Sequence, residues 1–93
     1  MDEINKMIET CNAFKRKEFG IKEFQERIGT IYLPDECKHT LERLQHNAHN
    51  ELEKIIYCYG EDDLDSAKKV ANKLIRAANL ELERIGTLLP YAT

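Results

Sequence analysis

Four side chains of the kinds that bind metal ions follow one another at helical spacing in the middle of the chain. They are Glu42, His46, His49 and Glu53. Because they are 4, 3 and 4 residues apart, they share one stripe of a helix, a ligand-like arrangement. The stripe lies away from the apolar side of that helix, whereas metal sites in bundles are built from inward-facing ligands on several helices. We therefore expect a solvated or partner-contacting stripe, with no metal site and no cofactor.

Other reactive groups predict no catalysis either. His39 lacks the neighbouring Lys-Gly pair that usually follows the reactive histidine of a helical phosphotransfer domain. The acidic run Asp62–Asp65 lacks the glycine and glutamate that complete a calcium loop. The positions expected to face inward are almost all apolar or alanine, and the sequence has no glycine-rich phosphate loop. We expect a protein that is not an enzyme.

Two apolar series predict the long helices that must position these side chains, because their members recur every three or four residues. The first series is Cys37, Leu41, Leu44, Ala48, Leu52, Ile55 and Tyr59. The second is Leu64, Ala67, Ala71, Leu74, Ala78, Leu82 and Ile85. Gly60 can end the first helix in a left-handed conformation, and Asp62 or Asp63 can cap the second. The pattern predicts a helical hairpin with arms of about 23–26 residues.

Two shorter helices are expected in the first third of the chain. One apolar face, between about Asp2 and Lys17, consists of Ile4, Met7, Ile8, Cys11 and Phe14. The other, after Gly20, consists of Ile21, Phe24, Ile28 and Ile31. Pro34 interrupts the pattern before the first long helix. The predicted fold is all-α, a compact antiparallel four-helix bundle formed by one domain (residues 1–88) and followed by a short tail (residues 89–93).

The net charge of −3 is unevenly distributed along the 93 residues. Residues 1–30 carry no net charge, residues 31–63 carry a net charge of −5 and residues 64–93 carry a net charge of +2. The acidic balance disfavours direct binding to nucleic acid. No apolar run reaches the roughly 20 residues that span a membrane. The three cysteines, Cys11, Cys37 and Cys58, are odd in number and form no CxxC motif, so we expect reduced thiols and a cytoplasmic location.

The acidic segment is the expected place for a protein partner. Carboxylates in the first turn of a helix are explained by the helix dipole, but Glu42, Glu51 and Glu53 lie within the predicted helix. Tyr57 is expected on the same outward side as Glu42 and Glu53, and exposed tyrosines often anchor protein interfaces. The predicted partner-binding residues are Glu42, His46, Glu51, Glu53, Tyr57, Glu61, Asp62 and Asp63.

The order of several stretches resembles that of small helical immunity proteins encoded beside bacterial polymorphic or contact-dependent growth inhibition toxins. These stretches are Phe14–Lys17, Ile21–Ile28, Leu33–Asp35, Asn50–Tyr57 and Ala67–Ile75. The resemblance implies a non-catalytic inhibitor that binds a cognate toxin domain tightly. Many such toxins are basic nucleases, which an acidic surface would attract.

A second interpretation is a small regulatory or adaptor helical module that binds another helical protein or forms a homodimer. It predicts a self-contact through Leu80, Tyr57 or the tail residues Leu88 and Leu89. The sequence leaves open a monomer or a weak homodimer.

Overall fold

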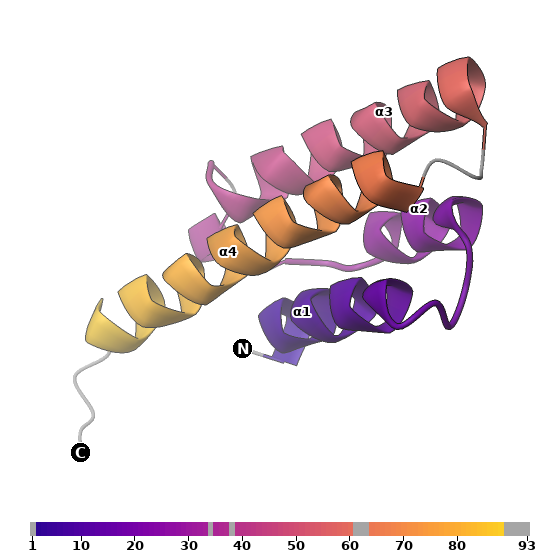
Figure 1. Cartoon of the computed structure of the whole chain (residues 1–93). Coiled ribbons are helices and arrows are strands. Elements are labelled where there is room, and N and C mark those ends of the chain that lie inside the picture. The colour runs from indigo at the N-terminus through magenta and orange to yellow at the C-terminus, as the bar shows by residue number, and fades with distance from the viewer. Residues whose placement is uncertain (1, 34, 38, 61–63, 89–93) are drawn as a thin grey trace.

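The chain folds into four α-helices, shown in Figure 1. The computed structural model describes residues 2–33, 35–37, 39–60 and 64–88, without the side chains of residues 2, 36 and 85–88. The helices are α1 (Asp2–Lys15), α2 (Ile21–Gly29), α3 (Leu41–Tyr59) and α4 (Leu64–Leu88), with a short 3₁₀ helix, η1 (Asp35–Cys37), before α3. The prediction of an all-helical fold with two shorter and two longer helices is confirmed for the described residues, which contain no strand.

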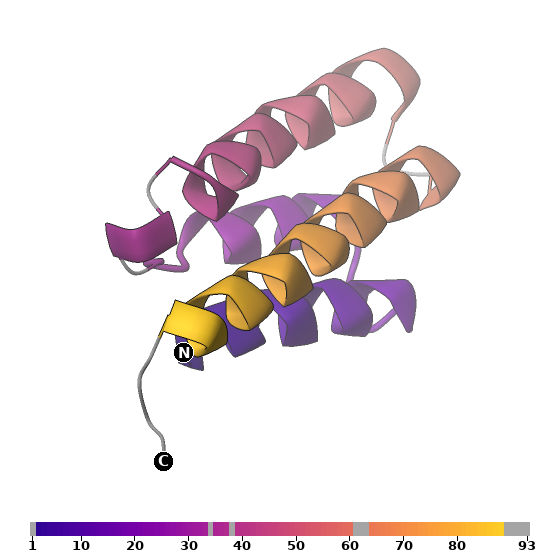
Figure 2. The same cartoon turned by 90° about the vertical axis from the view of Figure 1, so that its left-hand side faces the viewer.

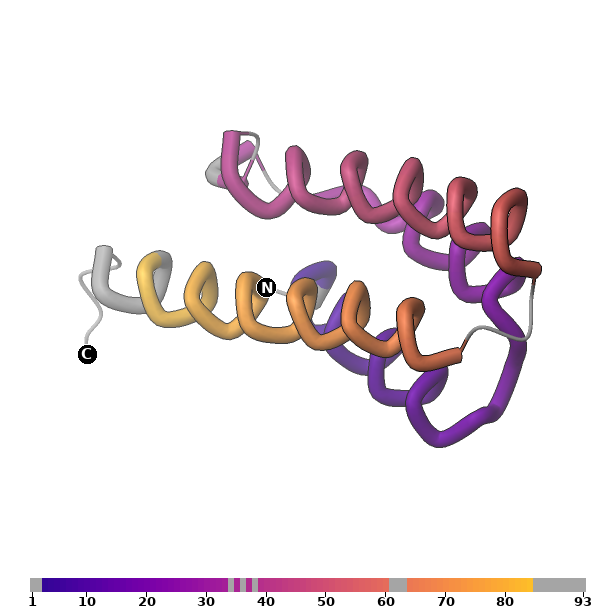
Figure 3. Tube along the Cα trace, turned by 45° about the horizontal axis from the view of Figure 1, so that its top comes forward, coloured from indigo at the N-terminus to yellow at the C-terminus, as the bar shows by residue number. Residues whose placement is uncertain are grey.

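The helices pack around one core in an elongated body of 47 × 24 × 19 Å. In Figures 1 and 2, α3 and α4 lie side by side, with α2 against α3 and α1 against α4. The tube in Figure 3 shows the same pairing, with α2 along α3 and α1 along α4. The contacts between α1 and α2 are fewer than those within the other packed pairs of helices. Each short helix is therefore attached mainly to one long helix, and the two long helices pack against each other.

The predicted apolar stripes of the short helices supply half of this core. Their buried side chains are Ile4, Met7, Cys11, Phe14, Ile21, Phe24, Ile28 and Ile31. The rings of Phe14 and Phe24 stack with centroids 4.4 Å apart and planes 3° from parallel. Burying a large apolar side chain contributes roughly 1.5–3 kcal/mol before the loss of conformational entropy is counted. The aromatic stack therefore fixes how α1 and α2 meet.

The predicted stripe of the first long helix is wrong at three positions. α3 begins at Leu41 and has 19 residues, so it is shorter than expected, and Cys37 is buried in η1. Leu44 and Tyr59 are exposed. Gln45 takes the inward position expected for Leu44, because its amide is needed as a hydrogen-bond donor at the end of α2. The stripe of α4 is confirmed from Leu64 to Leu82, where each predicted residue is buried or half-buried.

The sequence predicts a capping residue at each end of the α3–α4 connection. Gly60 has φ +87° and ψ 173°, and its N–H donates to the carbonyls of Ile55 (3.1 Å) and Ile56 (3.0 Å). The prediction of a glycine with positive φ at this helix end is confirmed. The caps expected at Asp62 or Asp63 fall outside the described residues.

An alanine at position 60 should destabilise the fold through backbone strain alone. A Cβ at this position would meet no atom within 4 Å, but only glycine adopts this conformation readily, at a cost of roughly 1–3 kcal/mol for other residues. Gly60→Ala should therefore lower the free energy of unfolding by about that amount in urea denaturation. Gly20→Ala is the control, because Gly20 is equally uncrowded but has φ −85°. Equal effects of the two substitutions would contradict the strain.

The three cysteines occupy different environments. Cys11 and Cys37 are buried and Cys58 is exposed, and no disulfide joins any of the three. Burial raises the pKa of Cys11 to about 12, and nearby Lys15 offsets only part of that rise. Because the thiolate is the reactive form, Cys11 should be inert in the folded protein.

A thiol reagent should therefore distinguish the cysteines. With 5,5′-dithiobis(2-nitrobenzoic acid) at pH 8, Cys58 should react at the rate of a free thiol, and Cys11 and Cys37 only when the protein unfolds. Cys58→Ser should abolish the fast phase. A fast phase that persists in this variant would contradict the burial of the other two thiols.

Candidate functional site

The carboxylate–histidine stripe, defined as Glu42, His46, His49, Glu53 and Tyr57, runs along the flank of α3 that faces α2. Four of these side chains are exposed and His49 is half-buried. Tyr57 is 89% exposed. The predicted outward position of Tyr57 is confirmed, and at 1.5 Å per residue the stripe is about 22 Å long.

Glu51 does not belong to this stripe. Its carboxylate lies 3.9 Å from the ammonium of Lys73 on α4, so Glu51 occupies the opposite flank of α3. Residues two apart on a helix point in directions about 160° apart, which separates Glu51 from Glu53. Of the other predicted partner-binding residues, Glu61, Asp62 and Asp63 lie outside the described part of the chain.

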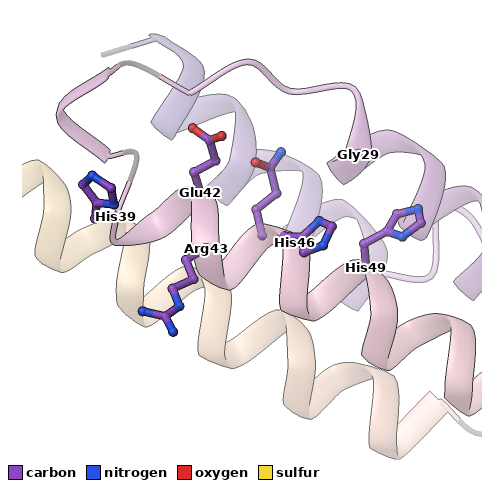
Figure 4. Close-up of a pocket in the computed structure, with 7 residues that line it drawn as sticks. Gly29, His39, Glu42, Arg43, His46 and His49 are labelled. Carbon is purple, nitrogen blue, oxygen red and sulfur yellow. The ribbon is translucent and has the colours of Figure 1, made fainter.

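The outer face of α3 between these flanks is not uniformly acidic. Arg43 and Lys54 are both exposed, and their helical positions lie between Glu42 or Glu53 on one side and Glu51 on the other. In Figure 4 the side chain of Arg43 points away from that of Glu42. The carboxylates of α3 therefore lie on two opposite flanks, and a molecule bound to one flank would contact only the carboxylates of that flank.

The stripe is positioned by a buried glutamine of α2. Gln25 is 6% exposed, and its Nε2 donates to Oε1 of Glu53 (2.7 Å) and to the carbonyl oxygen of His49 (3.2 Å). Gly29 lets the helices approach, because a Cβ at this position would lie 3.3 Å from Cδ2 of His49. Sequence patterning missed Gln25, since a glutamine on an apolar face is not distinguished from a solvated one.

Beside the first half of the stripe, α2 and α3 enclose the α2–α3 groove, which consists of two adjoining open depressions. The larger, of about 660 Å³, is lined by Gly29, His39, Glu42, Arg43, Gln45, His46 and His49 (Figure 4). The smaller, of about 270 Å³, is lined by Gly29, Ile31, Tyr32, Leu33, Glu42 and Gln45. Ligand sites commonly measure about 300–1,000 Å³, so the groove has the size of a site for a small molecule or a protruding side chain.

Tyr32 is the feature of the groove that sequence analysis missed. It lies in the linker that follows α2 (residues 30–33), is 89% exposed and faces the same depression as Glu42. The linker is held by Gln45, whose Nε2 donates to the carbonyl oxygens of Ile28 (2.5 Å) and Ile31 (2.8 Å). Helical periodicity gives no signal for a residue in a linker, and the sequence marks Tyr32 only as an aromatic residue two positions before Pro34.

The start of α3 is fixed by a buried carboxylate on α4. Glu81 is 7% exposed. Its Oε1 accepts hydrogen bonds from Nη2 of Arg84 (2.6 Å) and Oγ1 of Thr40 (2.8 Å). These bonds, together with one to the thiol of Cys37, outweigh burial and hold the pKa of Glu81 below its ordinary value; the bond to Arg84 has the largest effect. The Glu81 cluster (Cys37, Thr40, Glu81 and Arg84) thus fixes the position of the first turn of α3, which carries Glu42.

The Glu81 cluster should make the fold sensitive to acid. Because the pKa of Glu81 is lower in the folded protein, its stabilising effect is complete above its ordinary value of 4.5 and is lost as the pH falls toward the lowered value. Glu81→Gln should cost about 1–3 kcal/mol at pH 7 and flatten the dependence of the urea midpoint on pH below the ordinary value of 4.5. Glu26→Gln, an exposed carboxylate on α2, is the control, and equal slopes in both variants would contradict the role of Glu81.

Among the described residues, no three histidine, cysteine, aspartate or glutamate side chains come together as a metal site. No helix in the described segments is both long enough and apolar enough to cross a bilayer. Comparisons of the chain with models of protein families, with curated proteins and with solved structures found no match.

Proposed function

We propose that the protein is a non-catalytic inhibitor, an immunity protein that neutralises a cognate bacterial toxin domain through the carboxylate–histidine stripe. The observation that carries the proposal is Tyr57, a tyrosine 89% exposed on the same flank as two exposed carboxylates. Tyrosine brings a large contact area at low entropic cost and is enriched among the residues that dominate binding energy.

Electrostatics favour a basic partner. Glu42 and Glu53 lie on the stripe, and the acidic residues 61–63 follow the helix end near Tyr57. An acidic surface speeds association with a cationic nuclease domain and blocks the surface that its nucleic acid would use. In this proposal Glu51, on the far flank, acts only at long range. The protein itself contacts neither nucleic acid nor membrane.

The proposal includes the setting in which the inhibitor works. It places the protein in the cytoplasm, where its thiols remain reduced. It also takes the four helices to form an antiparallel bundle, which the reversal of chain direction between successive helices in Figure 1 supports. The bundle is a monomer or a weak homodimer.

A second candidate, the regulatory or adaptor module, is favoured by a different surface. Leu44 and Leu80 are 42% and 59% exposed and lie on the adjoining long helices α3 and α4. Light scattering together with a Leu80→Glu substitution tests the homodimeric form of this second candidate, because a monodisperse monomer would exclude it. A dimer that this substitution dissociates would support the second candidate.

The first candidate predicts that Tyr57 contributes directly to affinity. With the toxin domain encoded beside the gene as the titrant, Tyr57→Ala should weaken binding by about tenfold or more in calorimetry, as expected for a central tyrosine. Tyr57 is so exposed that the folded protein should lose little stability, which circular dichroism would check.

Leu80→Ala is the matched control, because it also truncates an exposed side chain of a long helix but lies on a different face. It should leave the affinity within twofold. Unchanged affinity of Tyr57→Ala, or a greater loss in Leu80→Ala, would refute the proposed surface.

A further inference from the structure

The side chains that line the α2–α3 groove indicate a binding site of its own, in addition to the neighbouring stripe. Its smaller depression brings together an exposed carboxylate, Glu42, and an exposed aromatic ring, Tyr32. The larger depression adds the imidazole of His46 next to the same carboxylate. Within the described residues Glu42 takes part in no ion pair, whereas the carboxylates of Glu23 and Glu81 do.

We propose that this groove binds an arginine side chain of the partner, with Glu42 as the carboxylate that accepts its guanidinium and Tyr32 as the ring on which it stacks. The inference rests on the proposed function, since it names the chemical group that the partner inserts beside the stripe. Arginine fits better than lysine because its planar guanidinium can pair with a carboxylate through two hydrogen bonds while its face lies on an aromatic ring.

The protein's own contacts hold the backbone segments that carry the two recognition groups. Gln45 lines both depressions and fixes the linker through the carbonyls of Ile28 and Ile31. This positions the backbone at Tyr32, while the bond from Thr40 to Glu81 positions the first turn of α3, which carries Glu42. A site whose backbone is already ordered loses less entropy on binding.

Charge complementarity selects a cation over an anion. The smaller depression contains one ionic side chain, Glu42, and no cationic one among its lining residues. The single cationic side chain that lines the larger depression, Arg43, points away from Glu42 in Figure 4. A guanidinium that enters between Tyr32 and Glu42 therefore meets the carboxylate without a competing positive group among the residues lining that depression.

The site can be tested with the intact protein and a small probe. Titration of the ¹⁵N-labelled chain with N-acetyl-arginine methylamide should produce saturable shifts of the Tyr32 and Glu42 amides and of the Gln45 side-chain amide. The citrulline analogue has nearly the same shape without the charge and should produce none. Equal shifts with citrulline, or shifts outside the groove, would overturn the proposal. So would stronger binding of inorganic phosphate at these residues.

Two variants assign the effect to the proposed groups. Glu42→Gln should weaken arginine binding by about fivefold, the effect of an exposed ion pair at its upper limit, and Tyr32→Leu should weaken it without loss of fold. Glu51→Gln, the same substitution on the opposite flank of α3, should leave it unchanged. Equal losses in Glu42→Gln and Glu51→Gln would show a general charge effect and refute the site.

Failure of this inference and failure of the proposed function give different results. If the toxin domain binds with the Tyr57-dependent affinity described above while the arginine probe gives no saturable shifts, the groove is not an arginine site and the inhibitor function stands. If the probe binds in the groove while the toxin domain does not bind, the arginine site stands and the proposed inhibitor function is wrong.

Discussion

The end of α2 imposes a hydrogen-bonding requirement on which the arrangement around α3 depends. The last carbonyl oxygens of a helix have no partner within it, and an unsatisfied carbonyl in a buried position costs free energy comparable to a lost hydrogen bond. Together with the N–H of Ile31 (3.5 Å), Nε2 of Gln45 meets this requirement at the carbonyl oxygen of Ile28, and it also donates to the carbonyl oxygen of Ile31 in the linker. One side chain of α3 therefore fixes the rotation of α3 about its axis and the path of the linker. The exposure of the carboxylate–histidine stripe follows from that rotation.

Two other polar side chains complete this constraint from neighbouring helices. Gln25 reaches from α2 to Glu53 and to the backbone at His49, and Glu81 reaches from α4 to Thr40. Each joins α3 to a different helix, at different points along its length. The hydrophobic effect is itself non-directional, whereas buried hydrogen bonds are lost when donor and acceptor separate. These contacts turn a generic apolar bundle into one with a defined outer surface.

The sequence predicted the apolar framework well because helical periodicity is a local property. The stripes of α1, α2 and α4 and the positive φ of Gly60 all follow from spacing and residue type. Which of Leu44 and Gln45 is buried does not follow from spacing, since both fit the helical period. Only the backbone carbonyls at the end of α2, which need a hydrogen-bond donor, favour the glutamine. Glu81 escaped prediction for the same reason. The separation of Glu51 from Glu53 could have been found, because residues two apart on a helix cannot share a flank.

The structure also changes how the acidity of the chain is understood. Counted along the sequence, the negative charge gathers between residues 31 and 63. In space, the carboxylates of α3 lie on two flanks with Arg43 and Lys54 between them. For the proposed binding of a partner, the total charge of the chain is therefore less important than which flank of α3 carries exposed aromatic residues. Tyr32 and Tyr57 are exposed on the flank facing α2, Leu44 and Leu80 are exposed on the α3–α4 side, and Tyr59 is exposed at the end of α3.

Hydroxyl-radical footprinting of a complex with the proposed toxin partner would show which flank is covered, because tyrosine and leucine side chains report their own exposure. If the proposed surface is correct, complex formation strongly reduces the oxidation of Tyr32 and Tyr57, while that of Leu44 and Leu80 stays as in the free protein. Protection of the two leucines with no change at the two tyrosines would contradict it.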